Sequence, residues 1–254
     1  MIAGEPSGDA LGAALMDGLL QETTAEFVGI GGPQMSERGL NSQFPMEELS
    51  VMGLLEVLPK LFHLLRRVRE TAEAVLSSDA EALITIDSPD FCLRVAKAVK
   101  AVRPDFPVIH YVAPSVWAWR AGRAAKMAKH VDHVLALLPF EPPYMEAAGM
   151  SCDFVGHPVV AAPLPTADDV ANFREEFDIS PKQKLLVVLP GSRGSEVTRL
   201  APIFREVADR LQDHIPELAI VVPAVRTQVS ALEQAFDGAN YTIIDPRDYS
   251  VSEA

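Results

Sequence analysis

Short apolar runs alternate along the chain with longer stretches that have helical spacing. The runs are expected to be strands of a buried parallel sheet, because both faces of each run are apolar. They lie at residues 27–30, 82–86, 108–112, 134–138, 185–189, 218–222 and 241–244. Stretches with helical spacing at 10–20, 91–102 and 200–211 fall between them. This alternation predicts an α/β fold in which helices cover parallel strands.

Residues 52–70 (MGLLEVLPKLFHLLRRVRE) have a strongly one-sided pattern. At 100° per residue, the apolar side chains fill an arc of about 180° and most charged residues lie opposite. One interpretation is a helix buried against a sheet. The other is an apolar strip that rests on an anionic membrane surface or takes up acyl chains. Pro59 predicts a kink or a break in this helix.

Polar turns follow several predicted strands. The turn GEPSGD at 4–9 reads as a loop that a ligand can approach closely, because glycine has no side chain. The turn after strand 82–86 puts Asp87 at the carboxyl end of a buried strand, where open α/β sheets keep their active sites. Asp87 is therefore a candidate general base. The alternative is a cap on the next helix by Asp87, Ser88 or Asp90, and we assign the cap to Asp90.

Both tryptophans of the chain lie in one loop, APSVWAWR at 113–120. Core packing is the usual fate of tryptophan. Two tryptophans this close in a Pro-Ser turn are not easily both buried, so we expect one of them to face a cleft. Arg120 and Arg123 follow directly.

The segment LLVVLPGSRGSE at 185–196 combines a predicted strand, a small-residue turn and the start of a helix. Such a turn can bind an anion, because backbone N–H groups point outward and the helix dipole favours negative charge. Arg193 lies in the turn, where its guanidinium could hold a phosphate. An ordinary turn with a solvated arginine remains the alternative.

Composition narrows the class of protein. The 254 residues contain no apolar run near the ~20 residues that span a bilayer and only two cysteines, Cys92 and Cys152. No secretory signal is recognisable, so a cytoplasmic protein is expected. The net charge of −13 argues against nucleic-acid binding. Residues 94–130, however, carry eight Lys and Arg against one acid, Asp105, which favours a particular anionic partner.

The proline-rich stretch at 159–166 (VVAAPLPT) is typical of a linker. It predicts two domains, residues 1–160 and 161–254. The second has about three predicted strands where five or six are usual, so we expect it to be truncated. The chain also opens on a first strand that is either very short or trimmed.

Eight motifs in a fixed order carry a resemblance to one family. They are AGEPSGD (3–9), GIGGPQM (29–35), MEELSVMGLLEVL (46–58), IDSPDF (86–91), HYVAPSVWAWR (110–120), LPFE (138–141), FVGHP (154–158) and LPGSRGSEV (189–197). The chain thereby resembles the lipid-A-disaccharide synthases, inverting glycosyltransferases with two Rossmann-like domains (the GT-B architecture). The resemblance implies an N-terminal acceptor-side domain and a C-terminal domain for the UDP-sugar donor.

The resemblance also implies a reaction. UDP-2,3-diacylglucosamine would donate its sugar to 2,3-diacylglucosamine 1-phosphate, giving the β-1,6-linked lipid A disaccharide phosphate and UDP. No cofactor and no metal are implied. A peripheral membrane protein would carry out this reaction on the cytoplasmic face of the inner membrane of Gram-negative bacteria.

With this resemblance, the motif residues receive expected roles. Asp87 matches the aspartate of the family's IDxPDF motif and is expected to be the catalytic base. The substrate-binding candidates are Gly4, Glu5, Ser7, Gly8, Asp9, Ser115, Trp117, Arg120 and Arg123, of which Arg120 and Arg123 are chosen for the acceptor phosphate from their charge alone. The diphosphate-binding candidates are Gly191, Ser192, Arg193, Gly194 and Glu196. The membrane-contact candidates are Leu55, Val57, Leu58, Leu61, Leu64 and Leu65.

Two other functions share some of these features. Another UDP-sugar enzyme of the same architecture, an epimerase or a peptidoglycan-type transferase, would share the fold but is not expected to carry IDSPDF and SVWAWR in this order. A non-catalytic lipid-binding remnant would keep the apolar helix and have no need of Asp87.

Overall fold

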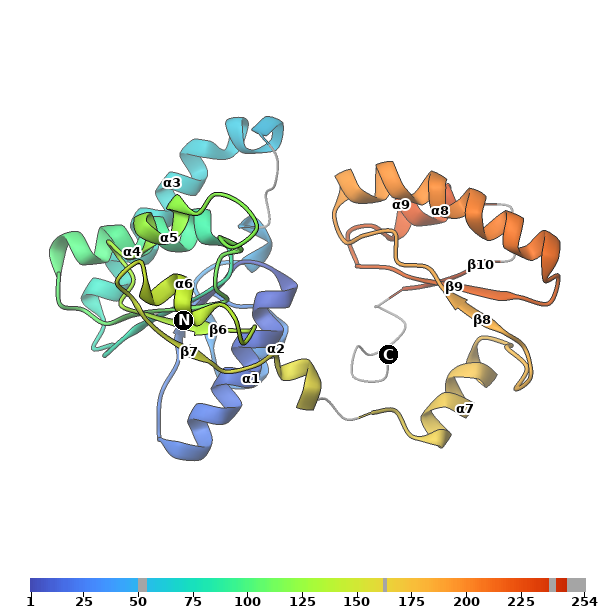
Figure 1. Ribbon diagram of the computed structural model, residues 1–254, viewed down its shortest axis with the longest axis horizontal. Coiled ribbons are helices and arrows are strands. Elements are labelled where there is room, and N and C mark those ends of the chain that lie inside the picture. The colour runs from blue at the N-terminus through green and yellow to red at the C-terminus, as the bar shows by residue number, and fades with distance from the viewer. Residues whose placement is uncertain (50–53, 162–163, 238–240, 246–254) are drawn as a thin grey trace. The chain divides into compact units, whose positions relative to one another are not determined.

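The computed structural model describes residues 1–49, 54–161, 164–237 and 241–245 (Figure 1). The chain divides into two compact units, Met1–Ala162 and Pro163–Ala254. Each unit has its own parallel sheet and its own core.

The N-terminal unit is built on a five-stranded sheet in the order β1-β4-β5-β6-β7. All neighbouring pairs are parallel. The strands are β1 (Ile2–Ala3), β4 (Leu83–Ile86), β5 (Val108–Tyr111), β6 (His133–Ala136) and β7 (Ser151–Phe154). A small parallel pair, β2 (Val28–Gly29) and β3 (Asn41–Ser42), adjoins β1 through a bridge between Ile2 and Ile30. Since β4 and β5 pair residue by residue, their carboxyl ends finish together.

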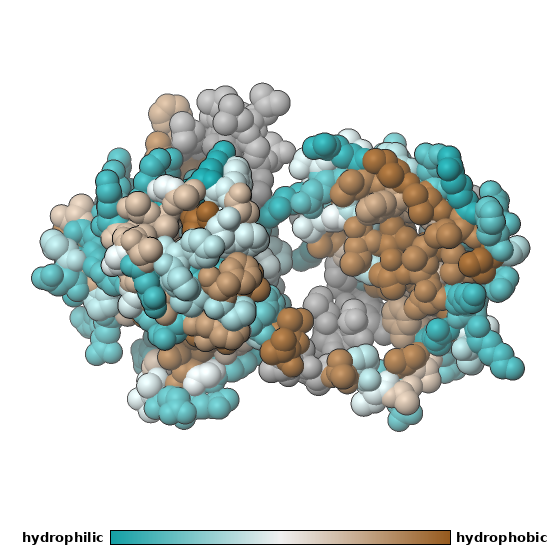
Figure 2. All heavy atoms as spheres, in the orientation of Figure 1, coloured by the Kyte–Doolittle hydropathy of each residue, from teal (hydrophilic) through white to brown (hydrophobic). Residues whose placement is uncertain are grey.

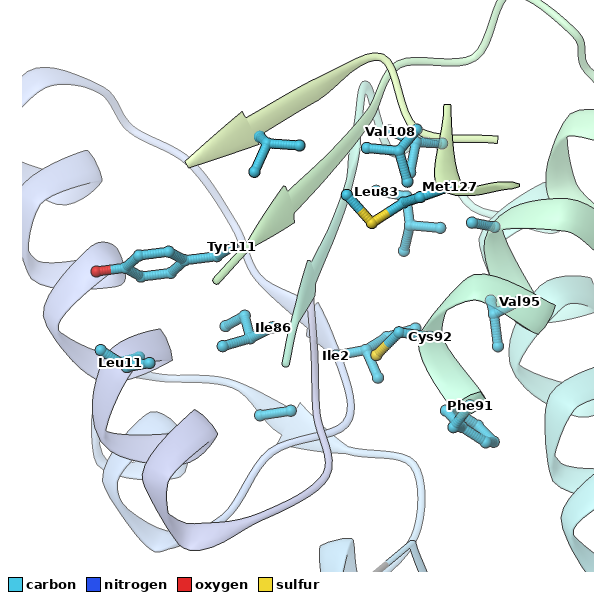
Figure 3. Close-up of a cluster of buried hydrophobic side chains, with 14 of the residues drawn as sticks. Ile2, Leu11, Leu83, Ile86, Phe91, Cys92, Val95, Val108, Tyr111 and Met127 are labelled. Atoms are coloured by element: carbon cyan, nitrogen blue, oxygen red, sulfur yellow. The ribbon is translucent and has the colours of Figure 1, made fainter. Parts of the chain in front are cut away.

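Helices cover both faces of this sheet. In Figure 3, Leu11 of α1 (Pro6–Glu22) and Val95 of α4 (Pro89–Val102) lie on opposite sides of the strands. The shorter helices are α2 (Pro33–Glu37), α5 (Gly122–Met127) and α6 (Pro142–Glu146), with 3₁₀ turns η1 (Met46–Glu48) and η2 (Pro158–Ala161). Ile2, Leu83, Ile86, Val95 and Val108 form part of one continuous buried core. The three layers follow from strands that are apolar on both faces.

Two local predictions at helix starts are wrong. The segment 4–9 is not a loop throughout, because Pro6 begins α1 and residues 6–9 form its first turn. Proline suits this place, since its fixed φ matches the helix and its missing N–H is not needed there. Asp90 is not the cap of α4 either. The N-cap position belongs to Ser88, in a left-handed conformation (φ 42°) and without a side-chain cap hydrogen bond.

Helix α3 (Leu54–Ser77) packs against α4 (Figure 1). It continues through Pro59, so the predicted break is absent from the described backbone, and it extends seven residues beyond the predicted end at Glu70. Of the membrane-contact candidates, Leu55, Val57, Leu58 and Leu61 have side chains outside the described part of the structure. Among the described helices, none combines the length and apolarity needed to cross a membrane.

The C-terminal unit has a three-stranded parallel sheet in the order β10-β9-β8. Its strands are β8 (Leu185–Val187), β9 (Ala219–Pro223) and β10 (Tyr241–Ile244), and its helices are α7 (Ala167–Glu176), α8 (Gly194–His214) and α9 (Val229–Ala235). Alternate residues of β9 serve two small cores. Ile220 and Val222 pack with α8 and α9, whereas Val221 packs with Phe173 and Phe177 near α7.

This unit also presents apolar side chains outward. Figure 2 shows a broad hydrophobic area over its surface. On α8, Val197, Ala201 and Ala208 are buried. The larger apolar side chains on other faces of α8 are exposed, namely Leu200, Ile203, Val207 and Leu211. Val187 of β8 and Leu189, which follows this strand, are exposed as well. The expectation that residues 185–189 form a strand buried on both faces is therefore wrong for Val187 and Leu189.

Candidate active site

A small open cavity of about 170 Å³ lies where β4 and β5 end. It is lined by Asp87, Pro89, His110, Val112, Ala113, Pro114, Ser115 and Arg123. Pockets that enclose a whole drug-sized ligand measure about 300–1,000 Å³, so this cavity suits only part of a larger molecule. It collects one carboxylate, one imidazole, one hydroxyl and one guanidinium from three segments of the fold: the turn after β4, β5 with its following loop, and α5.

Asp87 reaches the cavity because of an unusual backbone turn. Its N–H still donates to the carbonyl of Tyr111 (3.0 Å), as if β4 continued for one more residue. Its φ then turns positive, to 47°, and that of Ser88 is 42°. Side chains other than glycine rarely adopt this conformation, although aspartate tolerates it better than most. The half-buried Asp87 is thereby turned out of the sheet and into the cavity.

The strain is concentrated around this cavity. Of the five non-glycine residues with positive φ in the described chain, Asp87 and Val112 line the cavity and Ser88 follows Asp87. Val112 has a φ of 85°, which is unfavourable for a β-branched residue. Strained backbone that the surrounding structure holds in place is typical of functional sites.

His110 belongs to this site, and the sequence prediction did not include it. It is 1% exposed and lies opposite Thr85 in the β4–β5 register. Nδ1 of His110 is 2.8 Å from the hydroxyl of Thr85. Burial lowers the pKa of His110 to about 4, so the ring is neutral at pH 7. The available signal was a histidine inside the apolar run VIHYV, three residues before the start of the loop at 113–120.

Asp9, expected to hydrogen-bond substrate, makes other contacts. It is 2% exposed, and its two carboxylate oxygens accept hydrogen bonds from the backbone N–H groups of Gly32 (2.8 Å), Gln34 (3.0 Å) and Met35 (3.1 Å). These donors lie at the start of α2, where a negative charge is stabilised. Asp9 thus ties α1 to α2, and the proposed site does not include it.

The other residues of the first motif lie close to the turn after β4. A Cβ added to Gly4 would be 2.5 Å from the hydroxyl oxygen of Ser88, so glycine is needed for this close approach. Gly8 is buried beside Ile86. Glu5 is the N-cap residue of α1, and Ser7 is exposed.

The tryptophan loop divides into a part at the cavity and a part beside it. Ser115 and Arg123 line the cavity. Trp117 and Trp119 are both exposed, by 44% and 55%. Trp117 packs edge-to-face on Phe140, and Arg120 stacks over the ring of Trp119 at 4.3 Å.

Some basic side chains of the segment 94–130 have partners within the protein. Lys100 pairs with Asp132 (2.7 Å), and the guanidinium of Arg103 lies over the ring of Phe106 at 4.4 Å. Among the lysines and arginines of this segment that the structure describes, Arg123 is the one that lines the cavity.

The turn at 188–193 in the C-terminal unit already holds a negative charge. The Glu196 carboxylate accepts hydrogen bonds from the N–H groups of Ser192 (3.1 Å) and Arg193 (3.3 Å), and the Arg193 guanidinium lies 3.4 Å from it. These backbone donors, and the cation to a lesser degree, hold the pKa of Glu196 below its usual range. Gly191 has a φ of 124° and fits against Glu196, while Gly194 begins α8.

The anion at this turn is thus the Glu196 carboxylate of the chain itself. A carboxylate repels a diphosphate, so Glu196 is not suited to bind one directly. Within the described chain, no three acidic, histidine or cysteine side chains are grouped as a metal site would require.

Two comparisons of the sequence with known proteins find the same family. The sequence model of a family described as lipid-A-disaccharide synthetase matches residues 1–244. Relatives named lipid-A-disaccharide synthase include that of Ruegeria pomeroyi, 55% identical over all of this chain and 64% of the relative. The protein from Rhodospirillum centenum is 53% identical over 89% of this chain and 56% of the relative. The chain therefore spans about three fifths of the length of these curated relatives.

A solved structure has a similar fold. It is titled S. aureus MnaA-UDP co-structure, has a TM-score of 0.66 and 13% sequence identity, and covers 94% of this chain and 67% of that chain. At this identity the likeness shows the fold alone. The predicted fold class, α/β of the GT-B type with parallel sheets, is confirmed.

Proposed function

The chain belongs to the lipid-A-disaccharide synthetase family, and on that premise we propose that the protein joins two acylated glucosamines. The donor is UDP-2,3-diacylglucosamine, and the acceptor is 2,3-diacylglucosamine 1-phosphate. The acceptor's 6-hydroxyl oxygen forms a bond to the anomeric carbon of the donor as the bond to UDP breaks. UDP leaves with the electron pair, and the configuration at the anomeric carbon is inverted.

The cavity at the ends of β4 and β5 is the observation that carries this proposal. A carboxylate held at the edge of a parallel sheet can take the proton from the attacking hydroxyl, which makes the oxygen a stronger nucleophile. Asp87 is the carboxylate that lines the cavity. Arg123 lines the same cavity and supplies the positive charge for the acceptor's phosphate. The N-terminal unit is therefore the acceptor-side domain in this proposal.

The C-terminal unit would hold the donor. Its turn at 188–193 offers two backbone N–H groups and Arg193, which can stabilise the negative charge that develops on UDP as it leaves. UDP binding by the S. aureus protein of the same fold supports a UDP-sugar in this architecture. Diphosphate binding at these N–H groups would displace the Glu196 carboxylate.

A matched pair of variants tests the role of Asp87. Asp87→Asn keeps the size of the side chain, and asparagine tolerates a positive φ, so the fold should be preserved. We expect UDP release with the diacylated acceptor to fall about 10²–10⁴-fold, the usual contribution of a general base. Asp90→Asn, an exposed carboxylate on the next turn, is the control and should retain activity.

Three outcomes would refute parts of this proposal. Unchanged activity in Asp87→Asn would remove Asp87 from the reaction and favour a lipid-binding protein. Equal UDP release with an unacylated acceptor would favour another UDP-sugar enzyme. A drop in the Asp90→Asn control of the same size would mean that the turn, and not the Asp87 carboxylate, is what matters.

We further propose that α3 attaches the protein to the cytoplasmic face of the inner membrane. Phe62 is 84% exposed and Leu65 41% exposed, while Leu64 is half-buried. Arg66 pairs with Glu70 (2.7 Å), whereas the exposed Arg69 on the same helix adds a positive charge that favours an anionic surface. Apolar side chains at the water boundary would bring an enzyme to substrates that carry acyl chains.

Vesicle sedimentation tests this attachment. Phe62→Ser combined with Leu65→Ser should reduce binding to vesicles that contain anionic phospholipid and leave thermal unfolding unchanged. Val102→Ser removes an apolar side chain that is 66% exposed on α4 and serves as the control. Full vesicle binding by the double variant would refute the proposal, and so would an equal loss in the control.

A further inference from the structure

The imidazole of His110 is fixed in one tautomer by Thr85. The Thr85 hydroxyl lies 3.2 Å from the carbonyl oxygen of Ile109 and 2.8 Å from Nδ1 of His110. A hydroxyl has one proton to donate, and a carbonyl oxygen can only accept. Both contacts are hydrogen bonds only if Thr85 donates to Ile109 and accepts from an N–H at Nδ1. The proton of the neutral ring is therefore on Nδ1, and Nε2 carries a lone pair.

Nε2 lies on the edge of the ring away from Thr85. His110 lines the cavity, and its Nδ1 is turned towards Thr85. In the described chain, no buried side-chain nitrogen or oxygen lacks a hydrogen-bond partner. The described side chains and backbone supply no partner for Nε2, so this atom is not sealed inside the protein. It is left as an acceptor that a bound molecule can reach.

The acceptor sugar offers a matching donor. In 2,3-diacylglucosamine 1-phosphate, carbon 1 carries phosphate and carbons 2 and 3 carry acyl groups. Its free hydroxyls are those at carbons 4 and 6. If Asp87 takes the proton of the 6-hydroxyl, the 4-hydroxyl is the neighbouring group that still has a proton to donate. Asp87 directly follows β4, His110 lies in the neighbouring paired strand β5, and both line the same cavity.

We propose that Nε2 of His110 accepts a hydrogen bond from the 4-hydroxyl of the acceptor sugar and so selects the acceptor and orients its 6-hydroxyl towards Asp87. This inference rests on the proposed function, because that function defines the acceptor. His110 is a specificity residue in this account, and Thr85 is a positioning residue that acts through it. A protonated His110 could not accept this bond, and the ring is buried where the neutral form is favoured.

Two amide variants test the roles of Nδ1 and Nε2 of the His110 ring separately. His110→Gln can place an amide oxygen near the former position of Nε2 but gives up the bond to Thr85. His110→Asn can keep a bond to Thr85 but does not reach the cavity. The experiment measures the dissociation constant of the 1-phosphate acceptor in detergent micelles and of its 4-deoxy analogue, by calorimetry. All residues concerned belong to one compact unit, Met1–Ala162.

We expect wild-type protein to bind the 4-deoxy analogue about tenfold more weakly than the acceptor, which is the effect of one lost hydrogen bond. His110→Asn should bind the acceptor as weakly as it binds the 4-deoxy analogue. His110→Gln should regain most of the preference for the 4-hydroxyl, and Thr85→Val should lose part of it. A purely structural role for His110 predicts the opposite order, with Asn the better replacement because it keeps the bond to Thr85.

The outcomes separate this inference from the proposed function. Failure of the wild-type protein to bind the acceptor at all would overturn the proposed function. Normal binding with no preference between the acceptor and its 4-deoxy analogue would overturn the role of His110 alone. Retention of a tenfold preference by His110→Asn would overturn it as well.

Discussion

Replacement of Asp9 by alanine should strongly destabilise the N-terminal unit. The variant removes the acceptor of three backbone N–H groups, those of Gly32, Gln34 and Met35, in a place where Asp9 is 2% exposed. A hydrogen bond to a charged group contributes about 1.5–3 kcal/mol. The three bonds share one carboxylate, and water can enter the space that alanine leaves. We therefore expect a loss of about 3–5 kcal/mol, typical of breaking a buried charged contact.

Asparagine provides a graded comparison at the same position. Oδ1 of Asp9 accepts from Gly32 and Met35, and Oδ2 accepts from Gln34. An asparagine with its oxygen at the Oδ1 position keeps two bonds and turns an N–H group towards the third donor. Asp9→Asn should therefore lose about 1–3 kcal/mol, the cost of one unsatisfied buried donor. The order of stability should be wild type, then Asn, then Ala.

Tryptophan fluorescence during thermal unfolding measures this effect. Both tryptophans of the chain, Trp117 and Trp119, belong to the N-terminal unit, so the signal reports on that unit. At about 2–4 °C per kcal/mol for a domain of 150–250 residues, Asp9→Ala should lower Tm by roughly 10 °C. A shift of less than about 2 °C together with weaker acceptor binding would refute this reasoning. It would support instead the sequence prediction that Asp9 contacts substrate.

Three further predictions concern other parts of the chain. Glu48 on η1 bonds to Arg67 and His63 of α3, and these partners, the Arg67 bond first, hold its pKa below the usual value. These contacts stabilise the folded protein above pH 4.5, and their contribution is lost as the pH falls through the lowered pKa of Glu48. The free energy of unfolding of Glu48→Gln should therefore fall less steeply with decreasing pH than that of the wild type. An identical pH profile of the two proteins would contradict this. Burial raises the pKa of Cys92 to about 12 and that of Cys152 to about 11. Neither thiol should react with a disulfide reagent at pH 8 until urea exposes both, and rapid reaction of the folded protein would show that the core opens. Gly191 has a φ of 124°, and a Cβ added there would lie 2.5 Å from Cβ of Glu196. Gly191→Ala should therefore destabilise the C-terminal unit by about 1–3 kcal/mol, measured by urea unfolding followed by circular dichroism. The control Gly18→Ala, in open space on α1, should not destabilise the protein.

The strands and the sheet edge could be predicted from the sequence, because apolar runs such as 82–86 and 108–112 are local signals. The same is true of Asp87, which follows directly after such a run. The hydrogen bonds that Asp9 accepts could not be predicted in this way. Its partners lie 23 to 26 residues further along the chain, and no local pattern predicts that they meet it.

The remaining differences have similar causes. The sequence prediction did not include His110, because the pattern of an apolar strand does not indicate which of its residues faces a cavity. Val187 and Leu189 are exposed although their run is uniformly apolar, since an apolar sequence does not specify which of its faces is covered. A kink or a break was predicted at Pro59. The break is absent, because the cooperativity of a helix of 24 residues outweighs the preference of one residue. The position of a candidate site residue was thus predictable where it directly follows a strand and not where it depends on a distant partner.

The left-handed conformation of Val112 has a consequence for protein engineering. A glycine at this position would relieve a strained φ of 85°, so a search for thermostable variants should find Val112→Gly early. The same change would remove a side chain from the cavity wall and loosen the loop that carries Ser115 and Arg123. Selection for stability should therefore favour a different residue at position 112 from selection for the proposed activity, and variant libraries that must retain that activity should keep valine there.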